Sequence, residues 1–586
     1  MKYRLPYVIA FVAFALYLLV GQLQPFLRET AALTTFYTTG FFAAETISKP
    51  CGLLFYIASF LQSCFARPWL GACLFTSVLV AVAYAQKWAF RMSDTWFGLC
   101  WVAPFALLLN YTQLGYLIYT LKFPAVAFAP ALGFLAVFCL MGLWLRLERW
   151  WWRVVLMLLV PTVGYWFLGF YGVFVLPVLG FCELGIARWH LDRPRHSRNH
   201  PGLWGIALFA FGLLLPLLLR AVVQQPIDFW IGLFSFSDAE RQMRRPVAIL
   251  LALTLFFPIF RWDSKRRWVM IVSIVAFVAS GVATYTYSYR DANFLNTLRM
   301  KHAAEASDWE HILQLARANE VEPTRAQVCL ARLALFKTGR MGNELFTYPE
   351  GSASYNAPES NQWLRLMIGP LLYYHFGKTG FAYRWAMEDM VEYGERPAYL
   401  KYLYRVARLN GEEALAKRYE YALGRTLFYD NDNVNPNLNE DEKAIRPLMN
   451  YTDQLDGDNG LVEFYLLQSY ALSEGGSREM VELSLMNSLI TKNLNGFWPR
   501  FMALLPGWNG QIPAHYQEAA LMVAQLQGGM DISTLPIEPV IRQRFEQLVQ
   551  ASAQNGDNAS NAYALRPAFG DTYWYYYFFV EGLKTN

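Results

Sequence analysis

The stretch RWDSKRRWVMIVSIVAFVASGVATYTYSYR, residues 261–290, decides how the chain is organised. It begins with a basic patch, continues with an uncharged apolar run over 268–288, and ends in Thr and Tyr residues. An apolar run of roughly 20 residues is the length that a helix needs to cross a bilayer. Each cation of the patch would cost about 2.5–3.5 kcal/mol at the bilayer centre. The stretch therefore predicts one membrane crossing whose basic end stays in water.

The two halves of the chain on either side of this crossing differ in composition. The 586 residues are 55% hydrophobic and 16% charged, against about 25% charged residues in soluble domains. Residues 1–289 carry 23 Lys/Arg and 10 Asp/Glu (+13), whereas residues 290–586 carry 27 and 35 (−8). We expect an all-α fold, with a transmembrane bundle over 1–289 and an extracytoplasmic helical domain over 290–586. The acidic second half argues against nucleic-acid binding.

Apolar segments of the first half predict about eleven spans, with a range of ten to twelve. They cover 6–24, 51–66, 69–86, three short spans within 95–145, two within 154–187, and then 203–223, 246–260 and 268–288. The loops 146–153, 188–200 and 261–267 are basic, like the N-terminal Lys2 and Arg4. Because cytoplasmic loops are enriched in Lys and Arg, we expect the N-terminus in the cytoplasm and the second half outside a bacterial inner membrane.

The second half shows short amphipathic helices. Trp309, Ile312, Leu313 and Ala316 are spaced i, i+3, i+4, i+7, which places them on one helix face. Several helices of similar length resemble a degenerate tetratricopeptide-type array, although long loops interrupt the spacing. The chain closes with seven consecutive aromatic residues, Tyr573–Phe579. They either pack on an earlier helix or dock on a membrane interface.

Most of the common catalytic motifs are absent from the sequence. It has no P-loop, G-x-S-x-G, H-E-x-x-H or dinucleotide fingerprint. The histidines at 190, 196 and 200 lie in a basic loop, and the acidic runs 430–433 and 456–460 lack the Gly and Glu positions of a calcium loop. We expect no cofactor and no metal, and the sequence leaves open whether the protein is an enzyme.

The loop after the first span, residues 25–50, contains the candidate catalytic residues Glu29 and Glu45. Many spans followed by one large outer domain resemble membrane glycosyltransferases that use lipid-linked sugar donors. The resemblance implies that one of these carboxylates is the general base, and that Arg28, Lys49 or Arg91 meets the donor phosphate. The loop lacks the paired acidic motif of that class, so the alternative is that both are ordinary interfacial charges.

Short motifs point to a second resemblance. They are PCGL at 50–53, FLQ at 60–62, PWLG at 68–71 and DTYWYY at 571–576. With them the chain resembles an uncharacterised family of bacterial multi-pass membrane proteins, in which a second glycine stands where this chain has Cys51. The resemblance implies the architecture and no established activity.

Three functions remain open at this stage. The first is an envelope membrane protein whose outer helical domain docks other envelope proteins. The second is a glycosyltransferase-like enzyme acting on a polyprenyl-linked donor. The third is a transporter, which is disfavoured because the bundle has few intramembrane charges and no clear internal repeat. The lipid bilayer is the partner that all three share.

Overall fold

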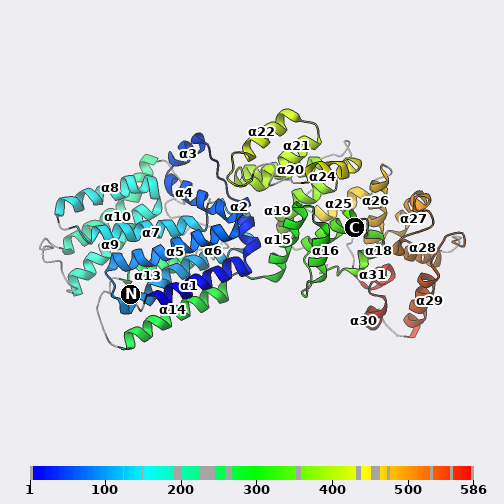
Figure 1. Cartoon of the computed structure of the whole chain (residues 1–586), viewed down its shortest axis with the longest axis horizontal. Helices are drawn as coiled ribbons and strands as arrows, with labels where there is room; N and C mark the ends of the chain where they lie inside the picture. Colours follow the sequence, from blue (N-terminus) through cyan, green and yellow to red (C-terminus); the bar gives the residue numbers. More distant parts are fainter. Residues whose placement is uncertain are drawn as a thin grey trace. The chain divides into compact units, whose positions relative to one another are not determined.

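The computed structural model describes residues 4–122, 125–147, 149–189, 201–223, 245–257, 267–351, 358–429, 437–449, 462–471, 476–527, 532–554 and 558–581. The described residues form helices joined by turns and irregular segments (Figure 1). Their one β-type pairing is an isolated antiparallel bridge between Tyr37 and Thr426. The chain divides into two units. Unit 1 is Met1–Arg290 with the short segments Tyr393–Pro397 and Gly424–Asp430, and unit 2 is the rest.

Unit 1 is a bundle of helices of very different lengths. Its helices are α1 (Leu5–Leu16), α2 (Gln24–Ala32), α3 (Gly40–Ile47), α4 (Gly52–Ser63), α5 (Pro68–Phe90), α6 (Val102–Thr112), α7 (Phe128–Trp144), α8 (Trp150–Leu168), α9 (Phe170–Trp189), α10 (Pro201–Val223), α13 (Arg245–Thr254) and α14 (Arg267–Tyr287). Shorter helical turns are η1 (Tyr17–Gln22), η2 (Cys64–Ala66), η3 (Asp94–Trp101) and η4 (Gly115–Tyr119).

Among the described residues, four helices are long and apolar enough to cross a membrane. They are Leu5–Gln22, Pro68–Phe90, Trp150–Leu168 and Arg267–Tyr287. The expectation of about eleven spans is therefore wrong. Other apolar stretches form shorter helices, and the three spans expected within 95–145 are replaced by η3, the 11-residue α6, η4 and the 17-residue α7. At 1.5 Å per residue, α6 reaches only about half of a ~30 Å hydrocarbon core.

The last long helix, α14, presents a mostly apolar surface to its surroundings. Ile271, Val275 and Val282 are each more than half exposed, in a helix that has no charged residue after Arg267. Exposed Trp268 and Tyr287 stand at its two ends, in the positions that aromatic side chains favour at bilayer interfaces. A long, exposed apolar face is unfavourable in water and suits a lipid environment.

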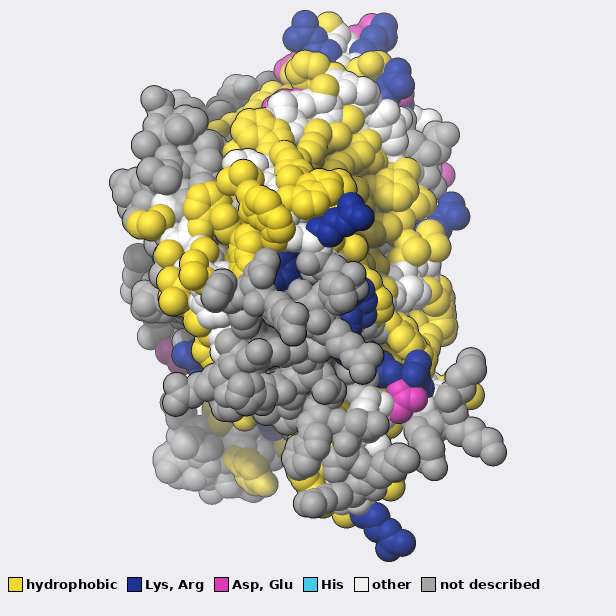
Figure 2. Space-filling view, turned by 90° about the vertical axis from the view of Figure 1, so that its left-hand side faces the viewer, with side chains coloured by type: hydrophobic (Ala, Val, Ile, Leu, Met, Phe, Trp, Pro, Cys, Tyr) yellow, Lys and Arg dark blue, Asp and Glu magenta, His cyan; other side chains and the backbone are white. Residues whose placement is uncertain are grey.

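A broad apolar area is visible on the face of unit 1 that carries α8, α9 and α10. Figure 2 shows apolar side chains gathered there, with a few Lys and Arg between them. On α8, the exposed apolar residues Leu158, Leu159 and Val163 contribute to the surface of this unit. The polar side chain of Glu183 points inward instead, and Trp144 Nε1 donates to its Oε1 at 3.0 Å while Arg153 Nη1 lies 3.8 Å away.

The core of unit 1 is built from aromatic side chains. α5 packs on α7, and the rings of Phe65, Phe75, Tyr111 and Phe128 lie within 5.1–6.1 Å of one another in five pairings. Aromatic pairs at such distances contribute about 0.5–1.5 kcal/mol beyond their buried area. This cluster joins η2, α5, α6 and α7.

The PCGL motif forms the turn between α3 and α4. Cys51 has φ = 66°, in the left-handed region that glycine adopts without strain. At Gly52 an added Cβ would lie 2.0 Å from the carbonyl oxygen of Thr46. The backbone geometry therefore requires glycine at position 52 and favours glycine at position 51. Cys51, which departs from the resembled pattern, is in a strained backbone conformation.

Unit 2 consists of helices that differ widely in length. They are α15 (Ala292–Glu305), α16 (Trp309–Arg317), α17 (Arg325–Lys337), α18 (Met341–Glu344), α19 (Pro358–His375), α20 (Thr379–Tyr393), α21 (Pro397–Leu409), α22 (Glu413–Leu423), α24 (Leu438–Ile445), α25 (Val462–Ala471), α26 (Arg478–Ile490), α27 (Leu494–Leu504), α28 (Ala514–Gln527), α29 (Pro539–Gln554), α30 (Asn558–Phe569) and α31 (Tyr573–Phe579). Lengths of 4 to 18 residues do not establish a regular repeat, so the tetratricopeptide-like arrangement remains a prediction.

The aromatic run at the end of the chain forms α31 and packs into unit 2. Tyr573, Trp574, Tyr575 and Tyr576 are buried. Trp574 Nε1 donates to the Glu518 carbonyl oxygen at 2.8 Å, and the Tyr576 hydroxyl donates to the Ile490 carbonyl oxygen at 2.7 Å. Of the two alternatives for this run, the structure supports packing on earlier helices for these four residues.

Candidate functional site

Glu29, the first candidate catalytic residue, lies on the short helix α2 and is almost fully buried, with 1% of its surface exposed. Its Oε1 accepts a hydrogen bond of 2.9 Å from the hydroxyl of Tyr119, at the end of η4. The next residue, Thr30, has its Oγ1 2.9 Å from the Tyr111 hydroxyl on α6. Tyr119 on η4 and Tyr111 on α6 therefore hold α2 in place.

A pocket that is partly open to solvent lies beside α2. Its wall includes Thr30, Gln62 and the cationic side chains of Lys122 and Arg396. Gln62 belongs to the FLQ motif. Its Nε2 donates to Thr34 Oγ1 at 2.8 Å, and its Oε1 accepts from the backbone N–H of Ala127 at 2.9 Å. Gln62 therefore ties the end of α2 to the segment that precedes α7, and this shapes the pocket.

Two short segments from the later part of the chain complete unit 1 at this end. Arg396 is buried and donates through Nη2 to the carbonyl oxygen of Leu121. The backbone N–H of Thr38 donates to the Arg425 carbonyl oxygen at 2.8 Å, next to the bridge between Tyr37 and Thr426. Sequence reasoning did not find Arg396, because its place in the pocket depends on a contact across 275 residues.

The other candidate residues lie in different places. Arg28 is exposed on α2. Glu45 and Lys49 pair with each other at 2.7 Å on the exposed side of α3. Arg91 is exposed at the end of α5, three residues from Asp94, whose carboxylate pairs with Arg4.

The positions of Arg4 and Asp94 show that Arg91 belongs to the end of the bundle where α1 begins. Glu29 follows α1 and η1 at the opposite end. Thr30, the residue after Glu29, lines the pocket with Lys122 and Arg396, whereas neither Glu29 nor Arg91 is a lining residue.

The pocket is chemically suited to an anionic group. A guanidinium offers paired N–H donors that match phosphate geometry, and an ammonium adds a point charge. Thr30 and Gln62 add polar side chains to the same wall. The Glu29 carboxylate is buried against Tyr119 and is not part of the pocket wall.

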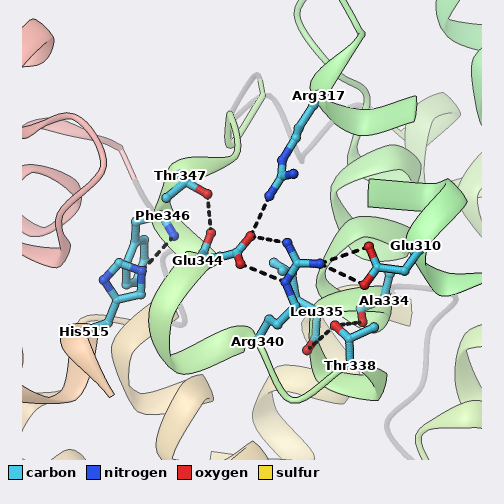
Figure 3. Close-up of polar contacts among 10 residues, drawn as sticks. All are labelled: Glu310, Arg317, Ala334, Leu335, Thr338, Arg340, Glu344, Phe346, Thr347 and His515. Carbon is cyan, nitrogen blue, oxygen red and sulfur yellow. Dashed lines mark hydrogen bonds and ion pairs between the residues drawn. The ribbon is translucent and has the colours of Figure 1, made fainter. Parts of the chain in front are cut away.

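Unit 2 contains polar clusters that serve structure. In Figure 3, Arg340 binds Glu344 through Nε at 2.7 Å and Glu310 through Nη1 at 2.9 Å, while Arg317 reaches Glu344 at 2.7 Å. The hydrogen bonds from Arg340 lower the pKa of the Glu344 carboxyl. These residues join α16, α17 and α18 at the surface.

His515 and Glu518 on α28 resemble an acid–base pair, with His515 Nδ1 3.0 Å from Glu518 Oε2. The other ring nitrogen, Nε2, accepts the backbone N–H of Phe346 at 3.5 Å (Figure 3). Glu518 Oε2 also accepts the backbone N–H of Tyr573 at 2.8 Å. Both residues are thus engaged in fixing neighbouring turns, so this pair is a structural element.

No group of three or more His, Cys, Asp or Glu side chains is arranged to hold a metal ion within the described ranges. The acidic runs 430–433 and 456–460 and the histidines at 190, 196 and 200 lie outside the described residues.

The described residues form an all-helical fold with candidate membrane helices and with a polar pocket at one end of the unit 1 bundle. A family model matches residues 2–580, and it is described as a family of unknown function, DUF6057. The chain belongs to this family. No curated protein and no solved structure matched the chain.

Proposed function

We propose that the protein is a multi-pass membrane enzyme that resembles glycosyltransferases and uses a polyprenyl-linked sugar donor. The single observation that carries this proposal is the pocket in which Lys122 and the buried Arg396 lie beside the helix of Glu29. A guanidinium offers paired N–H donors that match the oxygens of a phosphate, and an ammonium adds a point charge. A phosphate-bearing ligand therefore suits this pocket.

The proposed reaction assigns one role to each charged group. Glu29 removes the proton of an acceptor hydroxyl, whose oxygen forms a bond to the anomeric carbon of the sugar. The bond between that carbon and the donor phosphate breaks, and the electron pair leaves with the polyprenyl phosphate. Lys122 and Arg396 stabilise the negative charge that develops on the leaving group. Glu45 is the weaker candidate base because it is exposed and paired with Lys49.

We place this pocket on the extracytoplasmic side of a bacterial inner membrane. Arg4 pairs with Asp94, and Arg146 donates through Nη2 to the Trp88 carbonyl oxygen near the end of α5, so several cations gather where α1 begins. The other end receives α14, where the backbone N–H of Tyr289 donates to the Thr112 carbonyl oxygen. Cations on the N-terminal side support a cytoplasmic N-terminus. A reporter fused after residue 586 is expected to be active only outside the cytoplasm.

Binding of the donor lipid tests the pocket. The full chain in lipid nanodiscs is titrated with a polyprenyl phosphate, and with diacylglycerol as the uncharged control, and bound lipid is measured by native mass spectrometry. Arg396→Gln and Lys122→Gln are expected to weaken binding of the phosphate lipid about tenfold or more, whereas Arg91→Gln leaves it unchanged. Equal binding by all these proteins contradicts the proposed pocket.

Function in cells tests the catalytic role. Glu29→Gln keeps the size of the side chain and one oxygen acceptor but cannot take a proton. It is expected to abolish the function that the wild-type protein restores in a deletion strain, while Glu45→Gln restores it. Full function of Glu29→Gln would rule out the proposed base.

Docking of envelope proteins on unit 2 remains a prediction. The exposed large apolar residues that the structure describes in this unit lie on separate helices, such as Val391 on α20, Met502 on α27 and Tyr563 on α30. They do not single out one surface for a partner. The transporter alternative receives no specific support from the pocket, which lies at one end of the bundle.

A further inference from the structure

Unit 2 contains a second pocket, far from α2 in the sequence and different in chemistry. It lies between α17, α19, α25 and α26 and is partly open to solvent. Most of its wall is apolar, formed by side chains such as Leu372, Leu466, Leu483 and Met486. An apolar lining of this kind suits a small molecule with a hydrocarbon or aromatic body.

The charged groups at the edge of this pocket balance one another. Glu463 accepts from Arg325 Nε at 3.2 Å and from Arg332 Nη1 at 2.8 Å. Arg332 also pairs with Glu350, and Arg325 donates to the Glu350 carbonyl oxygen. Two guanidinium groups thus meet two carboxylates. A charged ligand would add a buried charge without a counterion, which is strongly unfavourable, so the pocket favours a neutral ligand.

Cys329 adds no charge to the pocket. It lies one helical turn from Arg325 and Arg332 on α17 and lines the pocket wall. Burial, and to a lesser extent the nearby Glu463 carboxylate, raise the pKa of its thiol well above the ordinary value. Cys329 is therefore a neutral thiol at physiological pH, and it behaves as part of the apolar wall.

Two polar atoms of the pocket residues have no hydrogen-bond partner in the part of the chain that the structure describes. Asn487, 3% exposed, donates through Nδ2 to the Leu467 carbonyl oxygen, while its Oδ1 accepts nothing. The Nε of Arg332 also donates to nothing. An unsatisfied buried polar group costs about 1–3 kcal/mol. Both residues line the pocket.

We propose that this pocket binds a small neutral alcohol or phenol. Its apolar body fills the space between Leu466, Leu483 and Met486, and its hydroxyl donates a hydrogen bond to Asn487 Oδ1. The hydroxyl oxygen can also accept from Arg332 Nε. The site is distinct from the pocket beside α2, because it selects a neutral ligand where the other selects an anion.

The experiment compares two probes of nearly equal size on the full chain in lipid nanodiscs. 4-Fluorophenol carries the hydroxyl and 4-fluorotoluene lacks it, and binding is followed by fluorine NMR with empty nanodiscs as the reference. Wild-type protein is expected to bind the phenol saturably and about tenfold more tightly than the toluene, the factor that one hydrogen bond of typical strength provides. 4-Fluorobenzoate, the charged probe, is expected not to compete.

Variants locate the site. Asn487→Leu is expected to weaken phenol binding about tenfold, and Leu466→Trp is expected to remove it by filling the pocket. Asn296→Leu is the matched control, because Asn296 is also a buried asparagine that donates to a backbone carbonyl, that of Leu315, but lies outside this pocket. It should leave phenol binding unchanged.

Three results would each overturn the proposal. The first is that wild-type protein does not bind the phenol saturably, and the second is that it binds the phenol and the toluene equally well. The third is that the Asn487→Leu and Leu466→Trp variants both fold and both bind the phenol as wild-type protein does. The probe comparison needs no variant, so it decides the question even if a pocket substitution prevents folding. Circular dichroism shows which variants fold. Polyprenyl phosphate binding, measured on the same samples, reports separately on the pocket beside α2.

Discussion

The hydroxyl of Tyr119 donates a hydrogen bond of 2.9 Å to the carboxylate of Glu29, although 90 residues separate them in the sequence. The bond places a buried carboxylate at the end of the bundle where Lys122 and Arg396 line a pocket. The bond also links η4 to α2. It therefore contributes to the stability of unit 1 and fixes the position of the Glu29 carboxylate.

Removing this donor is expected to destabilise unit 1. Tyr119→Phe deprives the buried Glu29 carboxylate of one hydrogen bond, which should lower the free energy of unfolding by about 1–3 kcal/mol. Thermal unfolding of the full chain in nanodiscs measures the effect. Tyr17→Phe is the control, since the Tyr17 hydroxyl accepts an exposed hydrogen bond from Gln22. This substitution should change stability by less than about 0.5 kcal/mol. Equal losses for both variants would contradict the structural role of the Tyr119 bond.

The buried ion cluster of unit 2 should be sensitive to the loss of one partner. Glu463→Ala leaves Arg325 and Arg332 without the carboxylate that both contact. Breaking a buried pair in this way typically costs about 3–5 kcal/mol. Glu388→Ala, which breaks an exposed pair with Arg384 on α20, should cost no more than about 0.5 kcal/mol. Denaturant unfolding, followed by circular dichroism, compares the two variants.

The lowered pKa of Lys337 predicts how the free energy of unfolding depends on pH. Burial lowers the pKa of this lysine from 10.5 to about 8, and Asp441 opposes the shift. Between these values the unfolded chain holds more protons than the folded one. The contribution of Lys337 to the free energy of unfolding therefore rises with pH across this window, by up to about 1.4 kcal/mol per pH unit, and it falls again as pH drops towards 8.

The test compares wild-type protein with Lys337→Met from pH 8 to 10.5. Ionisation of other groups contributes to both proteins and cancels in the difference. The stability advantage of Lys337→Met is expected to be largest near pH 8 and to shrink as pH rises. Lys417→Met, at an exposed position of α22, should show no such trend. A difference that does not vary with pH would contradict the expected shift.

The turn at Cys51 offers a stabilising substitution. Because Cys51 has φ = 66°, Cys51→Gly should relieve strain and raise the free energy of unfolding by up to about 1 kcal/mol. Gly52→Ala should have the opposite effect, since its Cβ would meet the Thr46 carbonyl oxygen. Thermal unfolding of both variants in nanodiscs checks the two signs. A loss of stability in Cys51→Gly would show that packing of the thiol outweighs the backbone strain.

Some features of the fold could be predicted from local sequence. The apolar run after Arg267 forms α14, because twenty uncharged apolar residues favour a long helix. The amphipathic spacing of Ile312 and Leu313 places both in the buried face of α16. The number of long spans was not predictable in this way. Hydropathy reports how apolar a segment is, whereas the lengths of α6 and α7 depend on how they pack on α5 and α14.

The residues of the candidate site also fall into those that the sequence could predict and those that only the structure showed. Glu29 was found because a carboxylate between two apolar segments is visible in the sequence. Arg396 was not found, because nothing near it marks a binding residue and its hydrogen-bond partner Leu121 is 275 residues away. Arg91 was grouped with Glu29 by its place in an early loop, yet α5 runs the length of the bundle and places Arg91 at the other end.

The sequence by itself determined the helical character of this protein, the apolar face of α14 and the contrast between a basic first half and an acidic second half. These follow from local composition and periodicity, which act along the chain. Only the tertiary structure decided that Glu29 is buried against Tyr119, that Arg396 completes the pocket beside α2, and that Asn487 and Arg332 line a second pocket in unit 2. Such sites depend on side chains that are distant in sequence, and their burial and charge balance arise only when the helices pack.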